Sequence, residues 1–127
     1  MNEYKFTKTF TYNDDDLISV ISSAVYDIGY WSCIDNDTNI WNKTSDSMDK
    51  DHTFEDVFFA VLKDGYAIEL IDVEDDDEVW ELTLEKLVNG MRLAVEQGHW
   101  DGDIDSLDGE IGDIIFQMAL FEEIVFG

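Results

Sequence analysis

The stretch from Asp64 to Glu78, DGYAIELIDVEDDDE, constrains this chain most, because an apolar run passes directly into five consecutive carboxylates. Residues 66–73 can be buried on a core, whereas residues 74–78 must stay in water. Asp64-Gly65 is the strongest short hairpin signal in such a sequence, and the run at 56–63 before it is also apolar. We therefore predict a central antiparallel hairpin over 56–73, followed by an acidic turn.

Hydrophobic periodicity predicts the other elements. Alternation predicts a strand over 3–12, and helical spacing predicts a helix from Asn13 or Asp14 to Ile28, with Gly29 at its end. Further predicted elements are a short strand at 30–34, a strand at 79–82, a helix that Thr83 caps and Gly98 ends, a helix from Glu110 to about Phe121 and a short tail that could be a strand. Residues 35–53, with a brief strand at Trp41, and residues 99–109 are predicted to be loops.

Chain length and apolar content indicate one folded unit. The chain has 127 residues, of which 45% are hydrophobic, enough for the core of a single domain. We predict one acidic α+β domain over residues 1–127, with an antiparallel sheet of about four or five strands and about three helices packed mainly on one face.

The charge of the chain limits what it can bind. It has 31 acidic and 7 basic residues, so the formal net charge is −24. Nucleic acid and anionic membranes would repel such a surface, so we expect no direct binding to either. The natural partners are cations or basic protein surfaces. Because no 18-residue apolar run and no signal-peptide core occur, we predict a cytoplasmic protein.

Side chains for catalysis are scarce. His52 and His99 are not in a metal-binding spacing, and Cys33 has no neighbouring cation in the sequence to activate it, so we expect it to be a small buried hydrophobe. A phosphate-binding glycine loop and a nucleophile elbow are both missing. We predict that the protein is not an enzyme and needs no cofactor.

The segment DGDID, with Asp101, Asp103 and Asp105, has the opening spacing of a calcium loop. The match then fails, because Ser106 stands where the turn glycine belongs and Gly112 where a bidentate glutamate is needed. We predict a solvated loop without a metal site, and weak binding of divalent cations remains an alternative.

The acidic residues of three segments are the candidate partner-binding surface. They are Asp46, Asp49, Asp51, Glu55 and Asp56; Asp72, Glu74, Asp75, Asp76, Asp77 and Glu78; and Asp101, Asp103, Asp105 and Asp108. Trp41 and Trp100 lie in the two predicted acidic loops, residues 35–53 and 99–109, and are candidate aromatic anchors for a partner.

One hypothesis is that this surface imitates a nucleic-acid backbone. Duplex DNA carries one charge per about 1.7 Å of axis, whereas one face of a strand places a carboxylate only every ~6.6 Å. One row of acids is therefore too sparse, and mimicry requires the three segments to lie on one side. If they point to opposite sides, only a soluble acidic domain remains.

Three parts of the sequence resemble a known group of proteins. Gly29-Tyr30-Trp31, Gly90 and the ending D-I-I-F-Q-M-A-L-F-E-E-I-V-F-G from Asp113 to Gly127 resemble small acidic proteins of tailed bacteriophages, which close with D-[VI]-[IV]-x-Q-x-A-L-F-G-E-[IV]-V-[YF]-G. Glu122 stands where that pattern has glycine.

The resemblance implies a phage origin and defines no catalytic residues. Small acidic phage proteins are similar to nucleic-acid mimics that block CRISPR or restriction nucleases. The functional hypothesis is thus a phage-encoded, non-catalytic inhibitor that binds the basic surface of a host nucleic-acid-binding protein in the host cytoplasm. The alternative is an interaction protein with another host target, or an accessory protein that forms a homodimer.

Overall fold

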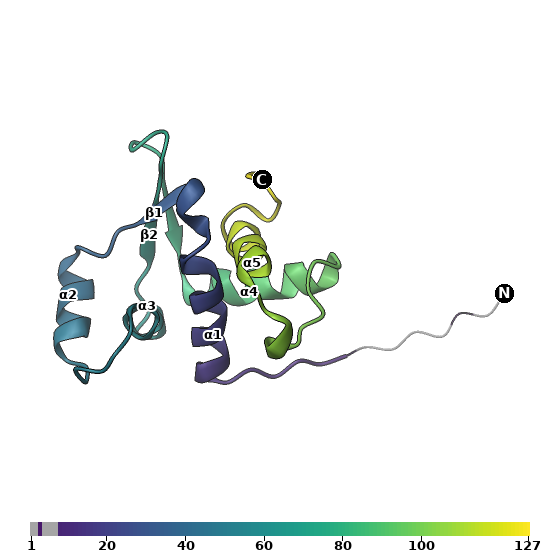
Figure 1. The fold of residues 1–127 in the computed structure, drawn as a ribbon, viewed down its shortest axis with the longest axis horizontal. Coiled ribbons are helices and arrows are strands. Elements are labelled where there is room, and N and C mark those ends of the chain that lie inside the picture. The colour runs from purple at the N-terminus through teal and green to yellow at the C-terminus, as the bar shows by residue number, and fades with distance from the viewer. Residues whose placement is uncertain (1–2, 4–7) are drawn as a thin grey trace.

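The computed structural model describes residue 3 and residues 8–127, and within them it shows an α+β fold with five α-helices and a three-stranded antiparallel sheet (Figure 1). The elements are α1 (Asp14–Val25), a 3-10 turn η1 (Ile28–Tyr30), β1 (Ser32–Ile34), α2 (Asn39–Asp46), α3 (Phe54–Lys63), β2 (Ile68–Asp72), β3 (Val79–Leu82), α4 (Leu84–Glu96), a 3-10 turn η2 (Ile104–Ser106) and α5 (Gly109–Phe121). The α+β class is as predicted, with more helices and fewer strands.

Side-chain caps fix where the predicted helices begin. Asn13 and Asp16 form a reciprocal capping box at α1, Thr83 accepts the Lys86 N–H at α4, and Asp108 accepts the Ile111 N–H at α5. These bonds satisfy N–H groups that have no partner within the helix. The predicted helix starts after Asn13 and Thr83 and near Glu110 are confirmed, but the predicted end of the first helix is wrong, because α1 ends at Val25 and Gly29 lies in η1.

The predicted hairpin at 56–73 is half wrong, because its first arm is helix α3. Thr53 and Asp56 form a capping box, and Gly65 lies just beyond the helix with φ of 92°, the left-handed conformation that favours glycine. Val57, Phe58, Val61 and Leu62 are buried along one side of α3.

Residues 35–53 are also not one long loop. Thr38 accepts the Trp41 N–H at 3.1 Å and starts α2, so Trp41 is helical rather than part of a strand. The Trp41 and Phe54 ring centroids are 4.8 Å apart, and this contact packs α2 against α3.

The sheet has the strand order β1-β2-β3. Ile34, Leu70 and Trp80 are cross-strand neighbours on its core face, and Leu70 is fully buried. Residues 74–78 form the acidic turn between β2 and β3, as predicted. Of the predicted strand at 3–12, residues 4–7 lie outside the described residues, and residues 8–12 are not in a strand; the 124–126 tail is not a strand either.

Helix α5 occupies the centre of the helical layer, beside α1 and α4 (Figure 1). Glycines permit this approach: a Cβ at Gly90 would lie 2.5 Å from the Ile115 carbonyl oxygen, and one at Gly112 would lie 2.7 Å from the Ala24 nitrogen. The close crossings bury Ile115 and Phe116 completely. None of the helices among the described residues is long and apolar enough to cross a membrane.

Asp113 and Gln117 of α5 form hydrogen bonds that join this helix to Trp31 and to the C-terminal tail. The Asp113 carboxylate accepts hydrogen bonds from Trp31 Nε1 at 2.8 Å and from the Gln117 amide at 2.9 Å. Gln117 Oε1 accepts the N–H groups of Val125 and Phe126, and the Phe126 ring stacks on Trp31 with centroids 5.0 Å apart. The C-terminal tail is therefore held by side chains instead of by a sheet.

Candidate functional site

The three acidic segments do not share one end of the molecule. Figure 1 places the β2–β3 turn, residues 74–78, at the top, whereas the connection from α2 to α3, residues 47–53, lies at the lower left. Residues 101–108 follow α4 and lie in the lower half, near the start of α5. A continuous set of acidic rows that includes the β2–β3 turn and both other segments is absent among the described residues.

Many of the predicted site carboxylates have a local structural use. Asp72, Asp75, Asp101 and Asp103 each accept the backbone N–H two residues ahead, and Asp49 does the same for Asp51. Asp56 and Asp108 cap helices, and Glu55 accepts the Tyr26 hydroxyl at 2.7 Å. The remaining members, Asp46, Asp51, Glu74, Asp76, Asp77, Glu78 and Asp105, are exposed.

The two proposed aromatic anchors belong to the core. Trp41 is 7% exposed and packs between α2 and α3, and Trp100 is 4% exposed. Trp100 stacks on Tyr12 and donates from Nε1 to the Asp103 carbonyl oxygen at 3.0 Å. The prediction of surface anchors is thus corrected, because a partner cannot reach either indole without unfolding its surroundings.

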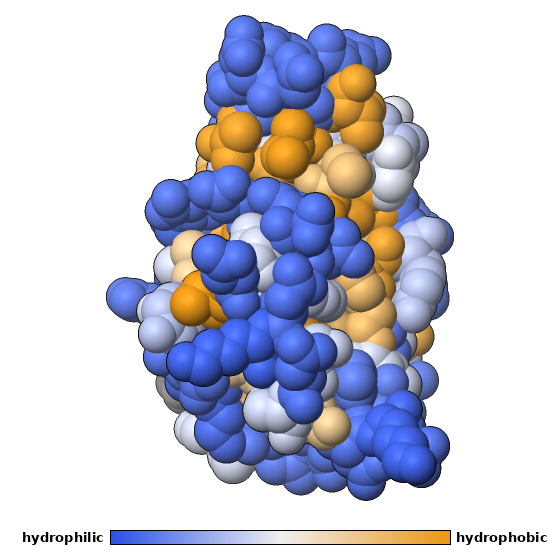
Figure 2. Space-filling model, turned by 90° about the vertical axis from the view of Figure 1, so that its left-hand side faces the viewer, coloured by the Kyte–Doolittle hydropathy of each residue, from blue (hydrophilic) through white to orange (hydrophobic). Residues whose placement is uncertain are grey.

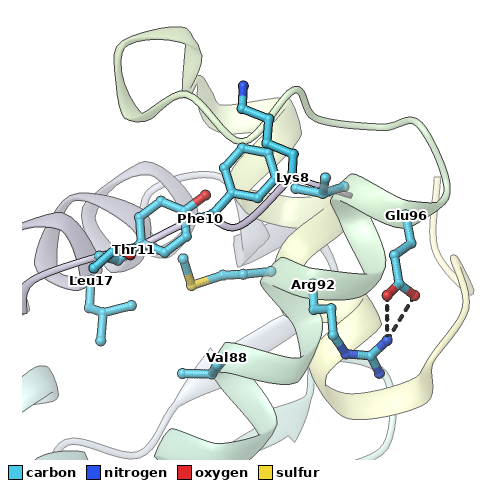
Figure 3. A pocket seen from close by; sticks show the side chains of 10 residues that line it. Lys8, Phe10, Thr11, Leu17, Val88, Arg92 and Glu96 are labelled. Carbon is cyan, nitrogen blue, oxygen red and sulfur yellow. Dashed lines mark hydrogen bonds and ion pairs between the residues drawn. The ribbon is translucent and has the colours of Figure 1, made fainter. Parts of the chain in front are cut away.

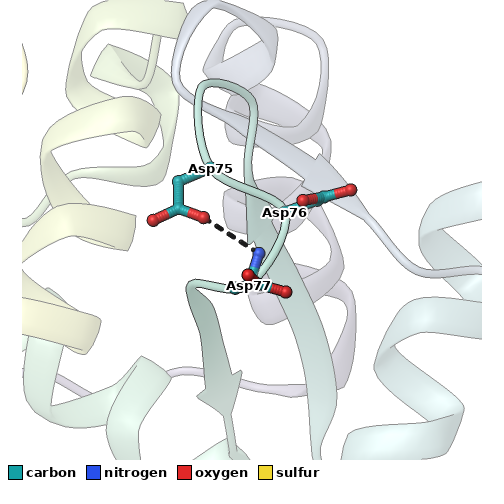
Figure 4. A group of neighbouring side chains, drawn as sticks. All are labelled: Asp75, Asp76 and Asp77. Atoms are coloured by element: carbon teal, nitrogen blue, oxygen red, sulfur yellow. Dashed lines mark hydrogen bonds between the residues drawn. The ribbon is translucent and has the colours of Figure 1, made fainter.

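Carboxylates of Asp75, Asp76 and Asp77 form the group in the described chain with metal-ligand oxygens within 4.8 Å of one another. Figure 4 shows their side chains leaving the turn in different directions, with Asp75 accepting the Asp77 N–H. All three are exposed. In the predicted calcium-like loop, Asp101 instead accepts from the Asp103 N–H and the Ser106 hydroxyl, bonds that lower the pKa of the Asp101 carboxyl.

A cavity of about 610 Å³ lies between residues 8–12 and α4 (Figure 3). Its lining is mainly apolar: Phe10, Tyr12, Leu17, Val88, Met91 and Val95, with Lys8, Thr11, Arg92 and Glu96. Figure 3 shows Arg92 and Glu96 bound to each other, and their contact is 2.7 Å. Histidine, cysteine and serine are absent from its described lining, whose polar side chains are those of Lys8, Thr11, Tyr12, Arg92 and Glu96.

Most acidic side chains lack a cationic partner. Between described residues, two ion pairs form, Lys63 with Asp14 and Arg92 with Glu96, and all four side chains are more than half exposed. Salt bridges of this kind contribute little to stability. The surface therefore carries a large uncompensated negative charge.

The outer face of the sheet is a candidate site that the sequence reasoning did not identify. Cys33, Ile71 and Val79 are neighbours across its three strands. Val79 is 41% exposed and Cys33 is also exposed, contrary to the prediction of a buried cysteine. Figure 2 shows the corresponding apolar band directly beneath the hydrophilic tip of the molecule. Within β2, Ile68 and Leu70 are buried, whereas Glu69 is exposed and Ile71 is half-buried, so Glu69 and Ile71 lie on the outer face.

No family model matches the chain, and no curated protein or solved structure matches it.

Proposed function

We propose that this protein is a non-catalytic binding protein of bacteriophage type that attaches through its exposed carboxylates to a positively charged surface of a host protein. One observation carries the proposal. The chain has 31 acidic but only 7 basic residues, and described residues form two ion pairs with each other, so most of the negative charge is not neutralised within the protein. A basic partner would supply the missing cations, and the long-range field would speed the encounter.

The residues that carry the phage resemblance contact one another in the fold. Asp113 accepts a hydrogen bond from Tyr30 at 2.5 Å and another from Trp31, and Gln117 binds the tail. The Gly-Tyr-Trp segment and the C-terminal motif are thus parts of one packed unit. The residues of the motif therefore hold the C-terminal tail and the segment at 30–31 on α5.

A narrower form of the proposal is that the host partner is a nucleic-acid-binding defence protein, such as a CRISPR or restriction nuclease, and that the protein acts as its inhibitor. The placement of the acids limits how this could work. Because residues 74–78 and 47–53 lie at different ends, the three segments do not share one side, and the requirement for a duplex mimic built from them is not met. Inhibition would require one acidic end to occupy a basic site by itself.

Host-lysate capture on the immobilised protein tests the proposal. We expect a partner that is retained at about 50 mM salt and released at about 500 mM, because screening weakens charge-based binding. Competition by added DNA would favour the nucleic-acid-binding partner, whereas a partner that DNA does not displace favours the interaction or accessory protein. Retention at high salt without DNA competition would contradict binding by charge.

Two matched variants locate the acidic end that binds. One replaces Glu74, Asp75, Asp76, Asp77 and Glu78 by their amides, and the other replaces Asp46, Asp49, Asp51, Asp103 and Asp105 by asparagine. Each removes five negative charges and changes the net charge from −24 to −19. Equal losses of binding would indicate attraction to overall charge, and a loss confined to the first variant would place the contact at the β2–β3 turn.

A further inference from the structure

The outer face of the sheet carries two adjacent rows of opposite chemistry. Cys33, Ile71 and Val79 form an apolar row across all three strands. In the next row, Glu69 lies directly opposite Glu81, and the Asp35 N–H donates to the Glu69 carbonyl oxygen at 2.9 Å, which sets Asp35 beside them. A row of three carboxylate residues thus follows a row of three apolar ones at a spacing of about 6.6 Å.

A second group of carboxylates borders the apolar row on its other side. Val73 continues β2 beyond Ile71, is 48% exposed, and leads into the turn at 74–78. Figure 2 shows an apolar band directly beneath the hydrophilic tip, with hydrophilic surface below it on the left and further apolar surface continuing downward on the right. The band is an exposed apolar stripe between two acidic borders, an arrangement typical of protein-binding surfaces.

In the free protein, charge repulsion within the row of Asp35, Glu69 and Glu81 is unfavourable. Like charges directly opposite each other on neighbouring strands destabilise a sheet. Lys86 donates from Nζ to the Glu81 carbonyl oxygen at 2.7 Å, and neither Glu69 nor Glu81 forms an ion pair with a described residue. A cation placed between these carboxylates by a partner would relieve the repulsion, so the border is complementary to positive charge.

We propose that this outer face is the docking site for a basic amphipathic helix of the partner protein. Aliphatic side chains of the helix would cover Cys33, Ile71 and Val79, and lysine or arginine on its two flanks would lie over the two acidic borders. For its two flanks to lie over the two borders, the helix runs across the three strands, whose span of ~10 Å at about 4.8 Å spacing corresponds to about two helical turns. A second copy of this chain does not fit, because it would bring the same carboxylates together. The inference rests on the proposed function and specifies its surface and partner chemistry.

The test uses the full chain and a labelled synthetic helical peptide with a leucine stripe flanked by lysines, beside a scrambled peptide of identical composition. Fluorescence anisotropy gives the affinity in about 0.15 M salt. The key variant is Val79→Glu, which adds a negative charge but interrupts the stripe. Glu69→Gln with Glu81→Gln removes the border charge, and Asp49→Asn with Asp51→Asn is the control of equal charge. Circular dichroism establishes that each variant is folded.

We expect the amphipathic peptide to bind at least about tenfold more tightly than the scrambled one, since only the former covers apolar surface. Val79→Glu should weaken it by roughly tenfold, and the Glu69 and Glu81 double variant by roughly fivefold, with less than about a twofold change in the control. Alkylation of Cys33, the only cysteine, should slow when the peptide is bound.

Equal or tighter binding by Val79→Glu, or unchanged Cys33 alkylation, would overturn the docking site while leaving binding by charge intact. Failure of both peptides to bind at about 50 mM salt would overturn the proposed function itself. If Val79→Glu does not fold, the comparison of the glutamine double variant with its control decides, and equal affinities of the two would overturn the site.

Discussion

Glu69 on β2 and Glu81 on β3 lie directly opposite each other on the exposed face of the sheet, and neither is ion-paired with a described residue. A fold stabilised by apolar burial on the other face of these strands can tolerate such a contact. The repulsion is retained at the border of an apolar row, where it lowers stability and favours a cationic partner.

Replacing Glu81 by Gln should therefore stabilise the free protein. We expect a gain of about 0.5 kcal/mol in the free energy of unfolding at low salt, and a smaller gain at high salt because screening already weakens the repulsion. Urea denaturation at two salt concentrations measures it. Glu85→Gln is the control, since Glu85 lies in the first turn of α4, where negative charge is favourable, and its loss should be slightly destabilising.

Glu122→Gly should also be stabilising. Glu122 ends α5 with φ of 58° and ψ of 17°, a left-handed conformation that costs a residue with a Cβ about 1 kcal/mol relative to glycine. The phage-like pattern has glycine at this position. We expect a rise in the thermal midpoint for Glu122→Gly and none for Glu123→Gly, whose φ is not positive. A lower midpoint for Glu122→Gly would show that the glutamate is not strained.

Gly90→Ala should be strongly destabilising. The added methyl group would lie 2.5 Å from the Ile115 carbonyl oxygen and 2.7 Å from the Ala119 nitrogen, and both atoms belong to the backbone of α5. Separating the two helices should cost about 1–3 kcal/mol, measured by chemical denaturation. Gly29→Ala is the matched control, because a Cβ there meets nothing within 4 Å. Similar stability of the two variants would rule out the close crossing of α4 and α5.

We expect the protein to lose stability at alkaline pH when Tyr30 ionises. Partial burial, the hydrogen bond to Asp113 and the charge of that carboxylate raise the pKa of Tyr30 from 10.0 to about 12. Because the folded pKa exceeds the unfolded one, the stabilisation is complete below pH 10.0 and is lost as pH rises through about 12. Tyr30→Phe should flatten the decline of stability in this interval. Absorbance titration of Asp113→Asn should show a lower Tyr30 pKa, and an unchanged value would exclude the proposed contact.

Prediction from the sequence succeeded for the helix starts, where a polar cap and a periodic apolar stripe agreed, but not for the end of α1, which lies at Val25 instead of before Gly29. At α1, Asn13 caps the helix, and Val20, Ile21 and Ala24 are buried on one side. It failed at α3, because Asp64-Gly65 is compatible with both a tight hairpin and a helix end. The β-branched and aromatic content of residues 57–62 favoured the strand, and tertiary burial of the helix overrode that propensity.

The candidate site was only partly predictable. Charge and exposure of the acidic segments follow from composition, but their placement depends on contacts distant in sequence, such as the packing of α2 on α3 through Trp41 and Phe54. The apolar row required the register that sets Cys33 opposite Ile71 and Val79. Pairings of this kind are absent from local sequence patterns.

Amide chemical shifts during titration with the lysine-flanked amphipathic peptide test binding to the outer face of the sheet most directly, because every acidic segment reports separately. We predict shifts concentrated at Cys33, Glu69, Ile71, Val79 and Glu81 and in the 74–78 turn, with small ones at residues 46–56 and 101–108. Equal shifts in all three acidic segments, or shifts confined to the latter two, would contradict the assignment of binding to the outer face of the sheet.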